Sequence, residues 1–310
     1  MKNTKTSLKG VLLLLLTAFI WGVSFVSQSV GAETLQPFSF MGIRTFMGAC
    51  VLLPLVLIRD KKAKKNLNEQ ELLAFKKNNK KTILYGMILG IFLALATNFQ
   101  QFAFYYSTAG KIAFITAMYM FFVPLVGLFF KKRLPHFTWI CIAFGFLGLY
   151  FLSFAKGSGF GDLNKGDILA LICSLFFTCQ ILLVEKFVSE CDGIKLSCFQ
   201  FYTAGIISLI LMFIFEEPSW AAIKSAGIAL LYSGIMSCGI AYTLQVVGQK
   251  YCESSIASLI MCMESVFAVL SAALLIHEKL TGREILGCVI MFLAIIISQT
   301  YDGFRNEKAV

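Results

Sequence analysis

SSIASLIMCMESVFAVLSAALLI, residues 254–276, is a stretch of 23 residues with a single charged side chain, Glu264. At about 1.5 Å per residue, one continuous helix of this length spans about 34 Å, enough to cross a bilayer core of about 30 Å. Glu264 would then lie near mid-membrane, where a charged side chain costs at least about 2.5 kcal/mol unless it faces a partner or a wet cavity. The stretch therefore predicts a membrane-spanning helix whose carboxylate either serves a functional cavity or forms a hydrogen bond in a packing seam.

The composition places the rest of the chain in the lipid bilayer as well. Of 310 residues, 58% are hydrophobic and 14% are charged, whereas soluble domains carry about 25% charged residues. The net charge of +10 comes from basic residues in short segments between apolar runs, so we expect no nucleic-acid partner. Ten cysteines without a CxxC pair indicate neither a disulfide framework nor a metal site. The first apolar stretch runs past Trp21 without a typical cleavage site and predicts an uncleaved helix.

Apolar stretches of spanning length predict ten helices, at residues 8–28, 37–58, 82–106, 110–130, 137–154, 167–184, 196–215, 228–248, 254–276 and 283–299. Of the 27 Lys and Arg residues, 20 fall on the side of the amino terminus, six fall on the other side, and Arg44 lies within a span. The positive-inside rule then predicts a multi-pass protein of the cell membrane with both termini cytoplasmic. The longest cytoplasmic segment, residues 59–81, is expected to be a solvated loop that orients the chain.

The two halves of the chain repeat one another. Residues 108–134 align with residues 254–280 without a gap at an offset of 146, and a glycine-rich polar segment, residues 156–165, separates the halves. Because each half has an odd number of spans, the second must enter the membrane from the opposite side. We therefore predict an all-α integral membrane protein with ten transmembrane helices in two inverted five-helix repeats, residues 1–155 and 156–310.

Four segments resemble the EamA-type family of the drug/metabolite transporter superfamily: FIWGVSFV in the first span, GIRTFMGA around Arg44, TAGKIAFITAMYMFFVPLVGLFFKKRL, and SSIASLIMCMESVFAVLSAALLIHEKL. The resemblance covers about residues 8–300. It implies a secondary transporter that moves small metabolites, often amino acids, out of the cell. Ser265 stands where many members have the proline of a Glu-Pro pair, which removes a kink. Lys132 and Glu278 precede the two basic-Leu pairs, and Lys132 stands where the family often has Glu, in a loop where the change should matter little.

Polar and aromatic side chains recur on the inner faces of the predicted spans. Helical spacing places Trp21, Ser24 and Gln28 on one face of the first span, with Phe177 and Gln180 on the matching face of its repeat mate. We predict that these residues line a mid-membrane substrate cavity together with Arg44, Asn98, Gln101, Tyr105, Thr116, Tyr119, Gln200, Tyr202, Gln245 and Glu264. Helix packing is the alternative role, because Asn, Gln and Thr also hydrogen-bond between helices in membranes.

Arg44 and Glu264 are the two charges within predicted spans. Counting from the outer ends of their spans places Arg44 about 10 Å deep and Glu264 about 18 Å deep, so an ion pair is at the edge of the arginine's reach. The alternative for Arg44 is that it snorkels toward the outer interface or caps buried carbonyls. Apolar neighbours favour a neutral Glu264, whereas a nearby Arg44 favours an ionised one. Either balance allows Glu264 to gain or lose a proton when the cavity turns from one side of the membrane to the other. We therefore predict Glu264 to be the proton-coupling residue.

Sequence motifs for catalysis are absent. The sequence contains no GxSxG or zincin motif, and its two histidines, His136 and His277, lie at loop edges, so we predict neither an enzyme nor a metal or other cofactor. Flat aromatic surfaces beside amides suit amino acids or aromatic compounds as substrates. The expected partners are thus the bilayer, a small-molecule substrate and protons. The alternative is a lipid or isoprenoid flippase, or a membrane scaffold that transports nothing; lipid handling favours a side opening with a basic rim.

Overall fold

The computed structural model describes residues 7–65, 67–107, 109–130, 136–153, 164–275 and 281–307, and no strand occurs in these ranges. The elements are α1 (Leu8–Thr34), α2 (Pro37–Lys64), α3 (Glu69–Ala103), α4 (Ala109–Thr116), α5 (Tyr119–Phe129), α6 (His136–Ser153), α7 (Lys165–Val188), α8 (Gly193–Phe215), α9 (Trp220–Ser225), α10 (Gly227–Leu231), the π-helix η1 (Tyr232–Ala241), α11 (Tyr242–Gln249), α12 (Ser254–Met261), α13 (Met263–Leu275) and α14 (Gly282–Glu307). The predicted repeat boundary at residues 155 and 156, with Lys132 and Glu278, lies outside the described residues.

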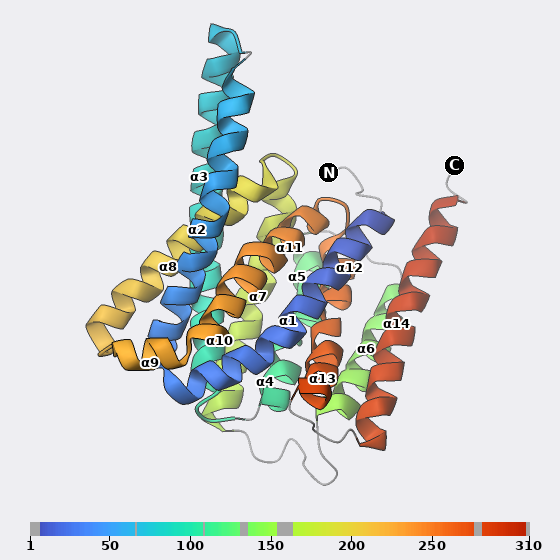
Figure 1. Cartoon of the computed structure of the whole chain (residues 1–310). Helices are drawn as coiled ribbons and strands as arrows, with labels where there is room; N and C mark the ends of the chain where they lie inside the picture. The colour runs from blue at the N-terminus through green and yellow to red at the C-terminus, as the bar shows by residue number, and fades with distance from the viewer. Residues whose placement is uncertain are drawn as a thin grey trace.

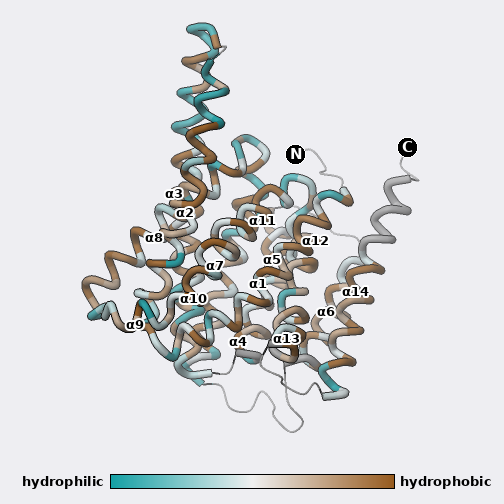
Figure 2. Tube along the Cα trace, in the orientation of Figure 1, coloured by the Kyte–Doolittle hydropathy of each residue, from teal (hydrophilic) through white to brown (hydrophobic). Residues whose placement is uncertain are grey.

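The surface of the helical bundle is apolar, as a lipid environment requires. Phe129 and Ile228 are each 87% exposed, and Figure 2 shows hydrophobic residues along most of the bundle. Eight helical segments among the described residues are long and apolar enough to cross a membrane. The two predicted spans outside this set, residues 137–154 and 283–299, coincide with α6 and α14, which pack against each other. The described part of the chain is therefore all-helical, and its apolar surface suits a membrane.

Three of the predicted spans are not single α-helices. The stretch at residues 110–130 is divided into α4 and α5, and residues 228–248 contain the π-helix η1. The prediction of one continuous helix over residues 254–276 is wrong, because a turn at Cys262 separates α12 from α13. The two divided helices meet at their breaks, where the Cys262 thiol donates a hydrogen bond to the carbonyl of Ala117 at 3.6 Å. The turn itself keeps this carbonyl paired, because the Met120 amide donates to it at 3.0 Å, so the Cys262 thiol adds a second hydrogen bond to the same oxygen.

The segment expected to be a solvated loop at residues 59–81 is mostly helical. α2 continues to Lys64 and α3 begins at Glu69, so the two helices project from the bundle as a hairpin (Figure 1). A capping box explains where α3 begins: Asn68 accepts from the Glu71 amide at 2.8 Å, and the Glu71 carboxylate accepts from the Asn68 amide at 2.9 Å. Figure 2 shows the projecting part to be largely hydrophilic, so it extends into water.

The base of this hairpin is joined to the α7–α8 turn by ion pairs. Lys195 lies 2.5 Å from Asp60, and Arg59 lies 3.1 Å from Asp192. Lys195 is only 6% exposed, whereas the Arg59 and Asp192 side chains are each more than 40% exposed. Exposed pairs contribute about 0 to 1 kcal/mol, so the buried Lys195 pair is the stronger constraint on this contact.

Small residues allow the helices to pack with their backbones close together. α2 packs on α8, α3 packs on α7 and α8, and α1 packs on α13. At Gly22 of α1, the neighbouring α13 backbone lies where a side chain would otherwise project. α1 begins and α14 ends at the same end of the bundle (Figure 1).

We expect Gly22→Ala to destabilise the protein, because the added Cβ would lie 2.5 Å from the Cβ of Phe267 and 2.8 Å from the Ala268 nitrogen. Overpacking of this kind costs about 1 to 3 kcal/mol, which a thermal melt of detergent-purified protein would register as a lower midpoint. Gly227→Ala is the matched control, since nothing lies within 4 Å of a Cβ at that position. Equal melting of the Gly22 variant and the parent would contradict the close approach of α1 and α13.

Candidate functional site

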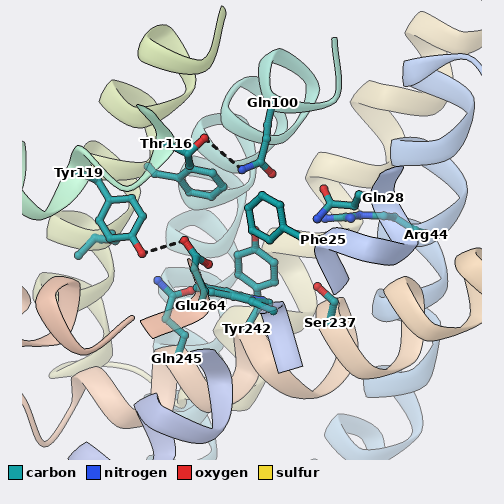
Figure 3. Close-up of a pocket in the computed structure, with 13 residues that line it drawn as sticks. Phe25, Gln28, Arg44, Gln100, Thr116, Tyr119, Ser237, Tyr242, Gln245 and Glu264 are labelled. Carbon is teal, nitrogen blue, oxygen red and sulfur yellow. Dashed lines mark hydrogen bonds between the residues drawn. The ribbon is translucent and has the colours of Figure 1, made fainter. Parts of the chain in front are cut away.

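A cavity lies where the divided helices meet, and α1, α2, α3, α4, α5, α7, η1, α11 and α13 all contribute to its wall. Its lining, drawn in Figure 3, consists of Trp21, Phe25, Gln28, Arg44, Gln100, Thr116, Tyr119, Phe177, Ile181, Ser237, Tyr242, Gln245 and Glu264. The cavity has a volume of about 30 Å³, which is room for one or two water molecules. A metabolite would need a larger space, so the surrounding helices must separate before one can enter.

Glu264 links the two divided helices across this cavity. It is the second residue of α13 and is 5% exposed. Tyr119, the first residue of α5, donates its hydroxyl to Oε1 of Glu264 at 3.1 Å (Figure 3). The first turn of a helix also favours a carboxylate, because unpaired backbone amides point toward it. The carboxyl group is thus buried, oriented by one hydroxyl and open to the cavity.

Arg44 lies on the opposite side of the cavity from Glu264. Figure 3 shows Arg44 beside Gln28, with the ring of Phe25 between this pair and Glu264. No ion pair joins Arg44 to Glu264 in the part of the chain that the structure describes. Arg44 is 2% exposed, which excludes the alternative that it snorkels to the outer interface. The cavity therefore contains a guanidinium and a carboxyl group that do not pair with each other.

Aromatic rings supply most of the apolar wall. The rings of Trp21 and Tyr242 are 4.5 Å apart between centroids, and those of Tyr119 and Phe177 are 6.5 Å apart. Phe25 projects between the two charged side chains (Figure 3). These rings present flat apolar faces, and Tyr119, Tyr242 and Trp21 add polar atoms at their edges.

A row of amides supports one side of the cavity. The Gln245 side chain lines the cavity and donates to the amide oxygen of Gln180 at 3.2 Å, and Gln180 donates to Gln200 at 3.2 Å. Elsewhere in the lining, Gln100 donates to the hydroxyl of Thr116 at 3.4 Å. Gln180 and Gln200 thus stand behind Gln245 and orient its amide.

The structure brings eight of the residues predicted from sequence into the lining: Trp21, Gln28, Arg44, Thr116, Tyr119, Phe177, Gln245 and Glu264. Seven others lie outside it: Ser24, Asn98, Gln101, Tyr105, Gln180, Gln200 and Tyr202. Asn98 instead joins α3 to α8 through Ser208 at 2.7 Å, and Gln101 donates to the carbonyl of Gln28 at 3.3 Å.

The other residues outside the lining have different surroundings. Tyr105 is 49% exposed and donates to the carbonyl of Leu35 at 3.1 Å. The ring of Tyr202 packs edge-on against Phe46 with centroids 5.7 Å apart. Ser24 is fully buried, and its hydroxyl has no partner in the described structure. A polar residue on an inner helix face can bond to a neighbouring helix as well as to a cavity, as Asn98 and Gln101 do.

Sequence reasoning missed Phe25, Gln100, Ile181, Ser237 and Tyr242. Phe25 and Ile181 follow Trp21 and Phe177 by four residues, so the helical spacing that selected the latter pair could have found them. Gln100 adjoins Gln101, which was selected in its place. Ser237 lies in η1, and Tyr242 is the first residue after that π-helix. A π-helix changes the number of residues per turn, so a projection that assumes an α-helix places these side chains on the wrong face.

Comparisons with known proteins agree on one class of membrane protein. The model of the EamA-like transporter family matches residues 8–154 and 164–300. An uncharacterized transporter of Archaeoglobus fulgidus is 28% identical over 285 residues, covering 92% of this chain and 83% of that protein. A probable amino-acid metabolite efflux pump of Escherichia coli is 24% identical over 321 residues, with 98% of both chains covered. A solved crystal structure with 16% identity has a TM-score of 0.76 over 94% of this chain and 97% of its own, a likeness of fold alone.

Tyr119→Phe should lower the thermal midpoint of the purified protein. The substitution leaves the ring in place but removes the hydroxyl that donates to Glu264, and a buried group without its hydrogen bond costs about 1 to 3 kcal/mol. Tyr106→Phe serves as the control, because Tyr106 is 51% exposed and should tolerate the loss of its hydroxyl. If the two variants melt alike, the Tyr119–Glu264 bond contributes no measurable stability.

Proposed function

Because the chain belongs to the EamA-like transporter family, we propose that it is a secondary active transporter that exports small metabolites such as amino acids or aromatic compounds. The observation that carries this proposal is the cavity between the divided helices, with aromatic walls, amides, a guanidinium and a carboxyl group. Such a lining suits a small polar molecule with an apolar body. Export as the direction is supported by the relative in Escherichia coli whose name describes an efflux pump for amino-acid metabolites.

The proposed architecture has ten transmembrane helices in two inverted five-helix repeats, residues 1–155 and 156–310. Corresponding helices of the repeats pack on each other, α2 on α8 and α6 on α14, as expected around a pseudo-two-fold axis. The divided helices α4–α5 and α12–α13 occupy corresponding places in the two halves. The shared end at which α1 begins and α14 ends (Figure 1), with 20 basic residues on the amino-terminal side, supports two cytoplasmic termini in the cell membrane.

Alternating access provides the mechanism. The cavity of about 30 Å³ is too small for an amino acid, so transport requires the repeats to rock apart, first on one side of the membrane and then on the other. The breaks between α4 and α5 and between α12 and α13 lie against the cavity, where broken helices in transporters commonly form the substrate site. Cys262 and Ala117 join these breaks across the two halves.

Glu264 is the proposed coupling residue. Its carboxylate lies in the wall of the cavity and is buried from lipid and water, so it is reached only through that cavity. Substrate and proton would compete for it, as an antiporter requires. Facilitated diffusion is the alternative, in which Glu264 only bonds α13 to Tyr119.

Purified protein in liposomes tests the transport proposal. Labelled amino acids, nucleobases and aromatic amines are loaded inside the liposomes. We expect a pH difference across the liposome membrane, or an excess of unlabelled solute outside, to change the flux of at least one amino acid. Empty liposomes give the background. Movement of none of these solutes, with scrambling of a fluorescent lipid, would replace the transporter by a flippase; movement of neither would favour a scaffold.

Glu264→Gln separates proton coupling from facilitated diffusion, since Gln retains the size and hydrogen bonding of Glu but does not titrate. We expect the variant to lose its response to an imposed pH gradient while exchange of substrate for substrate persists. Glu217→Gln, at an exposed position, removes the same charge outside the cavity and should respond as the parent does. A Glu264 variant with the full gradient response would contradict coupling through this residue.

A further inference from the structure

The guanidinium of Arg44 is a buried charge without a carboxylate partner among the described residues; its neighbours include the Phe40 ring, whose centroid lies 5.8 Å from the guanidinium carbon, and the Cys238 thiol. Arg44 is 2% exposed, and its Nε and Nη1 atoms have no hydrogen-bond acceptor in the described structure. None of the ion pairs found among the described residues includes Arg44. A buried ion without a counter-ion is costly, so proteins normally provide an acceptor or an acid for it. Here the open side of the guanidinium faces the cavity (Figure 3).

The packing of α2 holds Arg44 in this position. Glu216 accepts hydrogen bonds from the Phe38 and Ser39 amides at 2.8 and 2.7 Å, which anchors the first turn of α2. On the next turns α2 contacts η1 closely: a Cβ on Gly234 would lie 3.1 Å from the Arg44 carbonyl, and one on Gly48 would lie 2.5 Å from the Cβ of Cys238. With its backbone held at both points, Arg44 remains beside the cavity.

A second observation concerns what stands across the cavity. Glu264 faces the same space from α13, and Phe25 and Tyr242 lie between the two charges (Figure 3). Among the lining side chains, Trp21 offers a further indole donor without a partner. The side of the cavity that contains Arg44 therefore lacks an anion, and the side that contains Glu264 presents a carboxyl group to any cation that enters.

We infer that Arg44 binds the carboxylate of the transported metabolite while Glu264 faces its ammonium group, so that the site selects zwitterionic amino acids over the corresponding amines. This inference rests on the proposed transport function. A guanidinium can hold a carboxylate through two parallel hydrogen bonds, which are stronger than neutral ones. Because Phe25 and Tyr242 separate Arg44 from Glu264, the two groups do not pair directly, and both are left for the ligand.

Binding to the parent protein in nanodiscs, measured by calorimetry, tests the inference without a mutation. The twenty proteinogenic L-amino acids are compared, and the tightest is set against its decarboxylated amine and its deaminated acid; for phenylalanine these are phenethylamine and 3-phenylpropionate. We expect the amine to bind at least about tenfold more weakly, as the loss of a charge-assisted contact requires. Equal affinity of amine and amino acid, or no binding of any amino acid, would overturn the inference.

Arg44→Met then identifies the residue responsible. We expect this variant to bind the amino acid and the amine within about threefold of each other, and Arg44→Lys to retain part of the preference. Without ligand, Arg44→Met should melt about 2 °C or more above the parent, because a buried charge without a counter-ion is removed. Lys224→Met, at an exposed position on α9, is the control for charge loss. A lower midpoint with an unchanged preference would make Arg44 a structural residue only.

The liposome assay distinguishes this failure from failure of the proposed function. If the protein moves phenethylamine as well as phenylalanine, and Arg44→Met does not alter that ratio, the transporter stands and the role of Arg44 is wrong. If neither compound nor any other tested solute moves, the transport proposal itself fails.

Discussion

In hydrocarbon a backbone amide or carbonyl cannot be left without a hydrogen bond, so a membrane-spanning helix can be broken only where the surrounding protein provides a partner. At the two breaks, turn hydrogen bonds meet this constraint: the Met120 amide donates to the Ala117 carbonyl at 3.0 Å, and the Ser265 amide donates to the Cys262 carbonyl at 3.1 Å. Cys262 bonds to Ala117 across the junction, and Tyr119, just after one break, bonds to Glu264, just after the other. The cavity lies at this junction, so the irregular backbone and the buried polar side chains depend on each other.

An arginine and a carboxyl group at such a site would normally pair, and here they do not. Arg44 and Glu264 are both nearly inaccessible, yet Phe25 lies between them (Figure 3). The buried guanidinium is less stable alone than in a pair. The fold tolerates this because α2 and α13 are positioned by contacts elsewhere, at Glu216 and at Gly22. This arrangement retains a buried charge without a counter-ion at some expense of stability.

Close backbone packing gives the bundle its order in a medium that provides no hydrophobic drive between helices. Lipid chains are as apolar as leucine, so association depends on shape and on hydrogen bonds between helices. Gly22 against α13 and Gly48 against η1 supply the first. Asn98 with Ser208, and Gln180 with Gln200, supply the second. Asn98, Gln180 and Gln200, which were predicted to line the cavity, therefore join the helices whose other residues line it.

The sequence by itself determined the class of the protein, because runs of apolar residues with sparse charges have one stable environment. It also identified Arg44 and Glu264 as the ionisable residues within predicted spans. Helical spacing identified Trp21, Gln28 and Phe177 as lining residues, because residues three or four apart lie on the same face of a regular helix. It could not reveal the break at Cys262, because a divided helix and a continuous one have the same hydropathy. Nor could it separate Gln245, which lines the cavity, from Gln180, which supports it. That distinction depends on how each helix is rotated against its neighbours, which only the packing of the whole bundle decides.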